Sequence, residues 1–67
     1  MTKAEFIEKA RKIHGDQYDY RAVPDKVENY SVVPIVCFKH GMFYQSVYNH
    51  LQGQGCFECE HNDLNNN

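Results

Sequence analysis

Two pairs of metal-ligating residues lie in the second half of this 67-residue chain. Cys37 and His40 form the first pair, Cys56 and Cys59 form the second, and two residues separate the partners in each. Three thiolates and one imidazole match the closed tetrahedral shell of a structural zinc site, which leaves no position open to a substrate. The spacing therefore predicts that these four side chains bind one structural Zn²⁺. The alternative is that two cysteines are simply buried and that the pairing arises by chance.

The residues beside the two pairs agree with zinc knuckles. Gly41 follows the first pair and Gly55 precedes the second, and a knuckle needs backbone freedom where it turns sharply around the ion. His61 lies two residues beyond Cys59 and is an alternative ligand to His40. Pairing across a hairpin favours His40.

The length of the chain explains why a metal would be needed. A domain of 67 residues buries little apolar surface and usually requires a disulfide or a metal ion for stability. The chain has three cysteines, so a disulfide framework would leave one unpaired, and this odd number favours a metal and a reducing compartment. No apolar run approaches the roughly 18 residues of a membrane span. We expect a cytoplasmic protein with no membrane contact.

The charged residues are unevenly distributed. The formal net charge is −2, which argues against tight binding to nucleic acid through overall charge, because phosphate-binding domains are normally basic. Six of the seven basic residues nevertheless precede residue 27. If the first helix and the turn at Arg21 share a face, a modest phosphate-binding patch results, and the alternative is a solvated helix face. The basic candidates for partner contact are Lys9, Arg11, Lys12, Arg21 and Lys39.

The pattern of polar and apolar residues predicts a helix followed by short strands. Thr2 and Glu5 form a capping box, and an apolar stripe at helical spacing follows, so we expect a helix over about residues 3–14. Alternating aromatic residues predict a strand over about 18–23, and residues 27–30 are a second candidate for extended structure. The stripe consists of Phe6, Ile7, Ala10 and Ile13.

A hairpin is predicted around the first metal-ligand pair. Residues 31–36 are β-branched and apolar, with Pro34 placing part of that strand at an edge, and residues 42–45 return antiparallel to 35–37. Ser46 caps a short helix over 47–52. The fold class is therefore a small α+β zinc domain of zinc-ribbon or treble-clef type, with one domain over 1–61 and a flexible polar tail over 62–67.

Several motifs occur in the order and at gaps similar to those of a known family, namely Phe6-Ile7-Glu8-Lys9-Ala10, His14-Gly15-Asp16, Tyr18-Asp19-Tyr20, Cys37-x-x-His40-Gly41-x-Phe43, Asn49-His50-Leu51 and Gly53-x-Gly55-Cys56-x-x-Cys59. The chain resembles a small, uncharacterised zinc-ribbon-like domain of bacteriophage and bacterial proteins, which occurs alone or beside endonuclease modules of the homing and short-patch-repair kinds. The resemblance covers about residues 6–59 and implies a phage origin and a role near DNA processing. For a phage-encoded protein, the expected location is the host cytoplasm.

The chain departs from that family at two positions. The family usually has proline after the first cysteine of each knuckle, whereas Phe38 and Phe57 stand there in this chain. Proline stiffens such turns, so the knuckles of this chain are expected to be looser. The two phenylalanines either form a contact surface beside the metal or pack under the knuckles.

Three functions are compatible with the sequence. The first is a non-catalytic, zinc-stabilised recognition module that binds nucleic acid. The second is a protein-binding phage module that binds or inhibits a host factor, such as a defence or transcription component. The third is a nuclease resembling the His-Asn-His enzymes, suggested by Asn49 and His50, although these more often satisfy backbone groups and cover a core. We expect no enzymatic activity and a monomer or a weak homo-oligomer.

Overall fold

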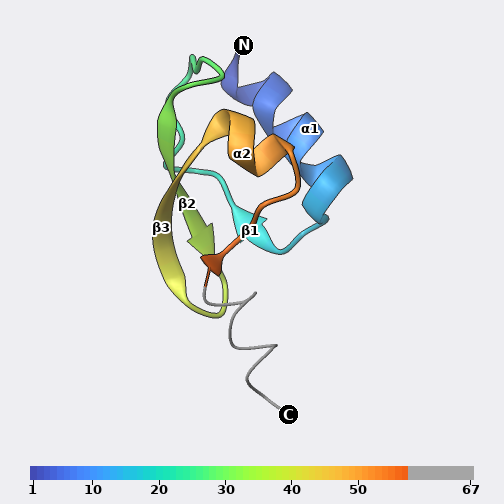
Figure 1. Ribbon diagram of the computed structural model, residues 1–67, viewed down its shortest axis with the longest axis vertical. Coiled ribbons are helices and arrows are strands. Elements are labelled where there is room, and N and C mark those ends of the chain that lie inside the picture. The colour runs from blue at the N-terminus through green and yellow to red at the C-terminus, as the bar shows by residue number, and fades with distance from the viewer. Residues whose placement is uncertain (58–67) are drawn as a thin grey trace.

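The computed structural model describes residues 1–57, in which two helices pack on one face of an antiparallel sheet with the strand order β1-β2-β3 (Figure 1). The predicted boundary at residue 61 and the predicted tail over 62–67 lie outside this described part. The elements are α1 (Lys3–His14), β1 (Tyr18–Asp19), β2 (Val32–Cys37), β3 (Gly41–Ser46) and α2 (Val47–Leu51). The prediction of a small α+β domain is confirmed.

Helix α1 begins where the capping box predicted. The Thr2 side chain accepts a hydrogen bond from the Glu5 backbone amide, and the Glu5 side chain accepts one from the Thr2 amide, so orphan donors of the first turn are satisfied. Phe6 and Ala10 are buried. Ile13 was predicted in the same stripe but is 46% exposed, because α2 packs against His14, one turn after Ala10, instead.

Strand β1 is shorter than predicted. The sequence suggested a strand over 18–23, whereas only Tyr18 and Asp19 pair with β2. The Asp19 carboxylate accepts a hydrogen bond of 2.9 Å from the Arg21 amide, and the Val23 amide bonds the Tyr20 carbonyl in a turn. Such local side-chain and turn bonds compete with a sheet ladder and end the strand.

Residues 27–30 do not form the predicted strand. The Val27 amide bonds the Met1 carbonyl, and Lys26 forms an isolated bridge with Thr2, so this segment is held by the N-terminus. The Ser31 amide then bonds the Glu28 carbonyl, which makes residues 28–31 a turn.

The predicted antiparallel hairpin is present as β2 and β3. Ile35 pairs with Phe43, and Cys37 pairs with Gly41 at the tight end. Gly41 has φ +86°, a conformation that residues with a side chain rarely adopt. Although β2 is the central strand, β1 pairs only with Val36 and Cys37. Pro34 therefore pairs with a strand on the β3 side alone. This position suits proline, which has no amide hydrogen to donate to a second neighbouring strand.

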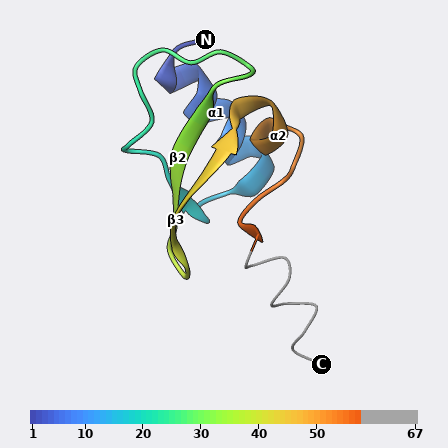
Figure 2. The ribbon, with the colours of Figure 1, turned by 60° about the vertical axis from the view of Figure 1, so that its left-hand side comes forward.

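Helix α2 returns the chain to the inner face of the hairpin. Ser46 caps it by accepting a hydrogen bond of 3.1 Å from the Asn49 amide, as predicted. Both helices lie on the same side of the hairpin when the molecule is turned (Figure 2). The opposite face of the hairpin is therefore uncovered within residues 1–57.

The core lies between the helices and the hairpin. Phe6, Ile35, His50, Val33 and Val47 are the largest side chains that are fully buried. Within residues 1–57, no helix has both the length and the apolar character that a membrane span requires. The remaining buried hydrophobic residues are Ala10, Tyr18, Tyr20, Val23, Val27, Cys37 and Cys56.

Candidate metal centre and an adjacent groove

Three of the four predicted metal ligands meet at the tip of the hairpin. Cys37 ends β2, His40 lies in the turn that follows, and Cys56 arrives after α2. The His40 Nδ1 atom is 3.7 Å from the Cys37 sulfur and 3.6 Å from the Cys56 sulfur, and all three ligand atoms lie within 4.8 Å of one another. They are close enough to hold a metal ion. The fourth predicted ligand, Cys59, and the alternative ligand His61 lie outside the described residues.

Cys56 is positioned by residues of the sheet. Its amide donates a 2.9 Å hydrogen bond to the Tyr18 hydroxyl, and the Gln45 side-chain amide donates a 3.2 Å bond to the carbonyl of the preceding Gly55. Gly55 was expected to supply a sharp turn, but its φ is not positive. Its role is steric instead, because a Cβ at this position would overlap the Tyr18 hydroxyl.

A buried hydrogen-bond chain continues from Gln45 into the core. Because the Gln45 Nε2 group donates to a carbonyl, its Oε1 atom must face His50, so His50 Nδ1–H donates to Oε1 at 2.7 Å. The other nitrogen, Nε2, then accepts from the Tyr20 hydroxyl at 2.9 Å. This assignment makes the His50 ring neutral.

The electrostatics of His50 agree with a neutral ring. Burial, together with the nearby His14, lowers the pKa of His50 to about 4, and burial raises the pKa of Tyr20 above its ordinary value. His50 is fully buried and both of its ring nitrogens are hydrogen bonded. It therefore has the structural role of covering the core, and it offers no nitrogen to a water molecule as a nuclease base would require.

His14 joins the two helices. Its ring stacks on His50 with centroids 4.1 Å apart and an interplanar angle of 26°. Its Nε2 group donates to the His50 backbone carbonyl at 2.8 Å, since a carbonyl oxygen can only accept. His14 therefore ties the last turn of α1 to a carbonyl of α2.

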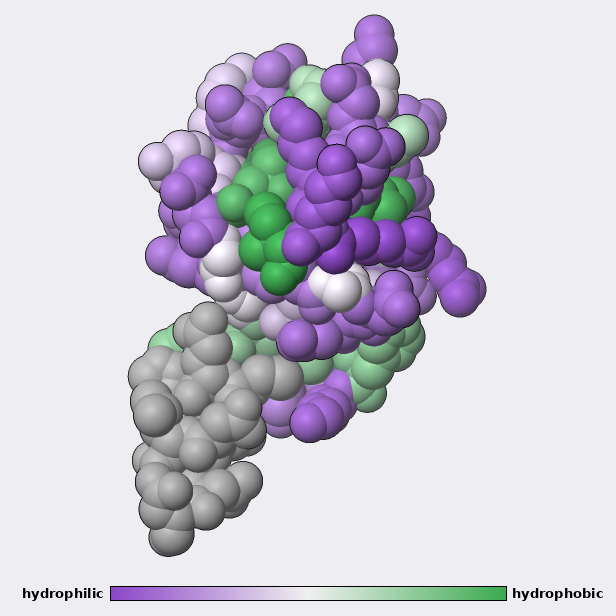
Figure 3. Space-filling view, turned by 90° about the vertical axis from the view of Figure 1, so that its right-hand side faces the viewer, coloured by the Kyte–Doolittle hydropathy of each residue, from purple (hydrophilic) through white to green (hydrophobic). Residues whose placement is uncertain are grey.

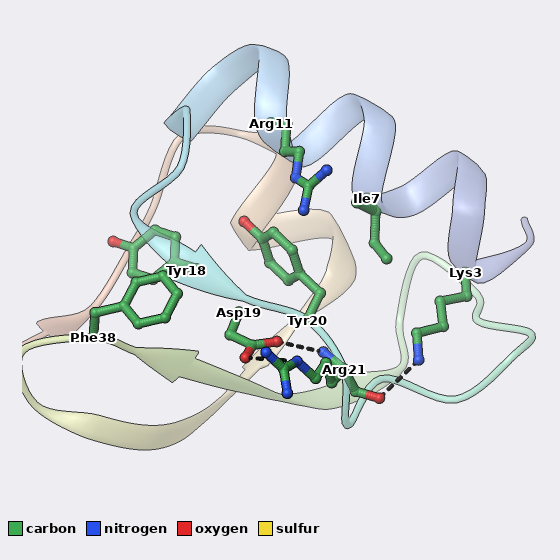
Figure 4. Close-up of a pocket in the computed structure, with 8 residues that line it drawn as sticks. All are labelled: Lys3, Ile7, Arg11, Tyr18, Asp19, Tyr20, Arg21 and Phe38. Atoms are coloured by element: carbon green, nitrogen blue, oxygen red, sulfur yellow. Dashed lines mark hydrogen bonds and ion pairs between the residues drawn. The ribbon is translucent and has the colours of Figure 1, made fainter.

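A groove lies between α1, β1 and the hairpin tip that carries the candidate metal ligands (Figure 4). Its volume is about 280 Å³. Lys3 and Arg11 extend from α1 toward the segment that carries Arg21 (Figure 4), so the first helix and the Arg21 turn do share a face. We call this cavity the α1–β1 groove, and it is lined by Lys3, Ile7, Arg11, Tyr18, Asp19, Tyr20, Arg21 and Phe38.

The other predicted contact residues lie elsewhere on the surface. Lys9, Lys12 and Lys39 are exposed, and Lys12 forms an exposed pair with Glu8 at 3.8 Å.

Seen from the α1 side, hydrophobic surface appears between hydrophilic side chains (Figure 3). Phe38 and Phe57 are each 68% exposed, so the hypothesis that they pack under the knuckles is wrong.

The chain of polar residues that supports the candidate metal ligands was not predicted from the sequence. Gln45 was assigned only to a strand, although Gln45, His50 and Tyr20 form one connected network. A signal was available, because Gln45 falls on the inward face of β3, where an uncharged polar side chain must find a buried partner.

Comparisons with known proteins place this chain in a family. The model of the family described as "Protein of unknown function (DUF723)" matches residues 1–60. The chain is also 36% identical over 61 residues to the uncharacterized protein R892 of Acanthamoeba polyphaga mimivirus, an alignment covering 90% of this chain and 22% of that viral protein. No solved structure gives a significant match. The chain therefore belongs to the DUF723 family.

Proposed function

We propose that this protein is a non-catalytic recognition module, stabilised by zinc, that binds nucleic acid as part of DNA processing. The proposal has two parts, the identity of the metal and the nature of the partner. The resemblance to domains found beside endonuclease modules is consistent with both parts.

Zinc is supported by the spacing of the ligand atoms. With Zn–S bonds of about 2.3 Å and Zn–N bonds of about 2.0–2.1 Å in a tetrahedron, sulfur and nitrogen ligands lie about 3.6 Å apart. The two sulfur–nitrogen separations at His40 are 3.6 and 3.7 Å. Cys59 is the proposed fourth ligand, and a shell of four protein ligands cross-links the chain without an open position for chemistry.

Binding to nucleic acid is supported by one observation, the convergence of Lys3, Arg11 and Arg21 on the α1–β1 groove. Asp19 is the acidic residue among the described groove residues, and its carboxylate already bonds the Arg21 Nε at 3.2 Å. Three of the nine acidic side chains, Glu58, Glu60 and Asp63, follow residue 57. A local positive surface is thus compatible with an acidic chain.

A salt titration tests the partner. Fluorescence anisotropy with labelled oligonucleotides at two salt concentrations should show an affinity that falls steeply with salt. The logarithm of the binding constant should fall with the logarithm of the salt concentration, with a slope of about 0.7–0.9 for each phosphate contacted. Arg11→Gln and Arg21→Gln should each reduce that slope by about the amount expected for one phosphate contact. Lys26→Gln is the matched control, because Lys26 is exposed and lies outside the groove. Absence of salt-dependent binding to any oligonucleotide would reject nucleic acid as the partner.

A protein partner is the second candidate, favoured by the uncovered face of the β2–β3 hairpin. Cross-strand pairing places Pro34 beside Tyr44 and Val36 beside Met42, and side chains alternate between the two faces of a strand. Val32, Met42 and Tyr44 are 64%, 54% and 68% exposed. An apolar sheet face of this kind is typical of an interaction surface.

Affinity capture distinguishes the two candidates. After nuclease treatment of a host lysate, a stoichiometric protein that binds the wild type but not Tyr44→Glu would support the second candidate. Tyr30→Glu is the control, since Tyr30 is 82% exposed and lies outside the paired strands. A protein lost on nuclease treatment would be bridged by nucleic acid and would favour the first candidate.

The nuclease hypothesis receives no support from His50. A general base must reach the proton that it removes, whereas His50 is fully buried with both nitrogens bonded. Plasmid nicking with magnesium or manganese would test this hypothesis directly.

A further inference from the structure

We infer that the α1–β1 groove binds single-stranded nucleic acid, with a backbone phosphate beside Lys3, Arg11 and Arg21 and an unpaired base against Phe38. This inference rests on the proposed function and names its ligand more narrowly. The charges, the aromatic rings and the size of the groove support it.

The cationic side of the groove is built from two chain segments. The Lys3 ammonium donates a 2.7 Å hydrogen bond to the Arg21 carbonyl, which holds the start of α1 against the segment after β1. The Arg21 side chain is 92% exposed and is oriented by Asp19 through its Nε atom. Its terminal guanidinium nitrogens can therefore meet a phosphate in a fixed orientation, the bidentate contact for which arginine is suited.

The aromatic side of the groove has one exposed ring. Tyr18 and Tyr20 are only 5% and 3% exposed, so they form the floor and present little surface for stacking. Phe38 is 68% exposed and belongs to the hairpin tip, directly after the candidate ligand Cys37. A base can stack on such a ring whatever its sequence, because every base has a π face.

The juxtaposition of cations and an exposed ring favours an unpaired strand. In a duplex the bases are stacked inside, and a protein meets phosphates and groove edges. In a single strand each phosphate is followed by a base that can rotate onto an aromatic side chain. A groove of about 280 Å³ falls just below the roughly 300–1,000 Å³ of pockets that enclose small molecules. It therefore fits one nucleotide unit of a longer strand.

Binding measurements on the full chain test this inference. Fluorescence anisotropy would compare labelled single-stranded DNA, single-stranded RNA and a duplex of the same sequence. We expect either single strand, or both, to bind at least about tenfold more tightly than the duplex, since the duplex offers no unpaired base. The two single-strand arms identify whether DNA or RNA is preferred.

Substitutions assign the base to Phe38. Phe38→Ala should weaken single-strand binding by roughly 5- to 140-fold, the range expected for one stacked base, without changing the salt slope. Tyr48→Ala should leave affinity unchanged, because Tyr48 is 55% exposed on α2 and does not line the groove. Arg21→Gln should reduce the salt slope.

The outcomes separate this inference from the proposed function. If the duplex binds as tightly as the single strands, or if Phe38→Ala has no effect on single-strand affinity, the inference is wrong, while salt-dependent binding through Arg11 and Arg21 still supports the proposed function. If no oligonucleotide binds, both are wrong.

Discussion

The two ends of the β2–β3 hairpin are held in place by different interactions. At the helix end, Phe6, Val33, Ile35, Val47 and His50 are fully buried, and apolar burial accounts for most of the packing. At the tip, Cys37 and Cys56 are buried beside His40, but the adjacent Phe38 is exposed. The helix end therefore has a conventional core, whereas the tip has a cluster of ligand atoms in place of one.

The difference suggests why a chain of 67 residues can fold with exposed side chains at the tip. A core of this size supplies no more than about 3–5 kcal/mol on its own. If the tip is cross-linked by a metal ion, its side chains need not be buried and are available to a partner. The two ends should thus respond differently to metal removal and to substitution.

Removing the metal should have the largest effect. A structural zinc ion contributes roughly 10–16 kcal/mol of apparent binding energy that is realised as folding energy, more than the core of a small domain supplies. We expect a chelator to release one equivalent of zinc, detected by native mass spectrometry, and to accelerate amide hydrogen exchange first at residues 37–41. Near-ultraviolet circular dichroism should then report loss of tertiary packing.

A ligand substitution provides the control for chelation. In Cys56→Ser, added zinc should no longer raise the midpoint of thermal unfolding, whereas it should do so for the chelated wild type. A freshly purified, reduced protein that contains no metal and keeps its fold in chelator would contradict the comparison between the two ends.

Truncating the core should have the next largest effect. Phe6 is fully buried and packs edge-to-face on Tyr20 with ring centroids 5.5 Å apart. Phe6→Ala should lower the free energy of unfolding by about 3–5 kcal/mol, measured by denaturant titration with saturating zinc. The matched control is Phe38→Ala, which should change it by less than about 0.5 kcal/mol because this ring is exposed. Equal losses in the two variants would mean that the tip also depends on apolar packing.

The sequence predicted those elements whose signals are local. The capping box gave the start of α1, and the apolar, β-branched run before the first ligand pair predicted the antiparallel hairpin that β2 and β3 form. Predictions of burial that depend on distant residues were less accurate. Ile13 fits a helical stripe by periodicity, but its exposure depends on where α2 packs, and α1 alone does not contain that information.

The candidate site was predictable only in part, because only the ligand spacing is a local pattern. Two ligands three positions apart are a local pattern, so Cys37 and His40 could be paired from their spacing. The sequence alone could not predict whether Arg11 lies near the Arg21 segment, because this depends on how α1 lies across β1. The bonds that join Tyr20, His50 and Gln45 cross three elements, and no local pattern specifies them.

Acidification should have an intermediate effect through His50. In the unfolded chain a histidine titrates near pH 6.5, whereas the pKa of His50 in the folded protein is about 4. Between these values the unfolded state binds the proton more readily, so the free energy of unfolding falls as the pH decreases from 6.5 to 4, by up to roughly 3 kcal/mol. Above pH 6.5 this histidine should contribute no pH dependence.

The pH effect must be separated from acid release of the metal. Unfolding would be measured against pH for the wild type and for His50→Gln, both saturated with zinc, and the difference between the two slopes isolates His50. Parallel slopes, or a His50 pKa near 6.5 by nuclear magnetic resonance, would show that the ring is not held neutral in the core.

Loss of the α1 cap should have the smallest effect and should be confined to the helix end. Thr2→Ala removes the hydrogen bond that the Glu5 amide donates to the Thr2 hydroxyl, so we expect a loss of about 1 kcal/mol in the free energy of unfolding. Glu8→Ala is the control, since its pair with Lys12 is exposed and contributes little. Because the cap lies at the opposite end from the ligand atoms, zinc affinity measured by competition with a chromophoric chelator should be the same in both variants. A change in zinc affinity in Thr2→Ala alone would show that the two ends are coupled through α1 rather than stabilised separately.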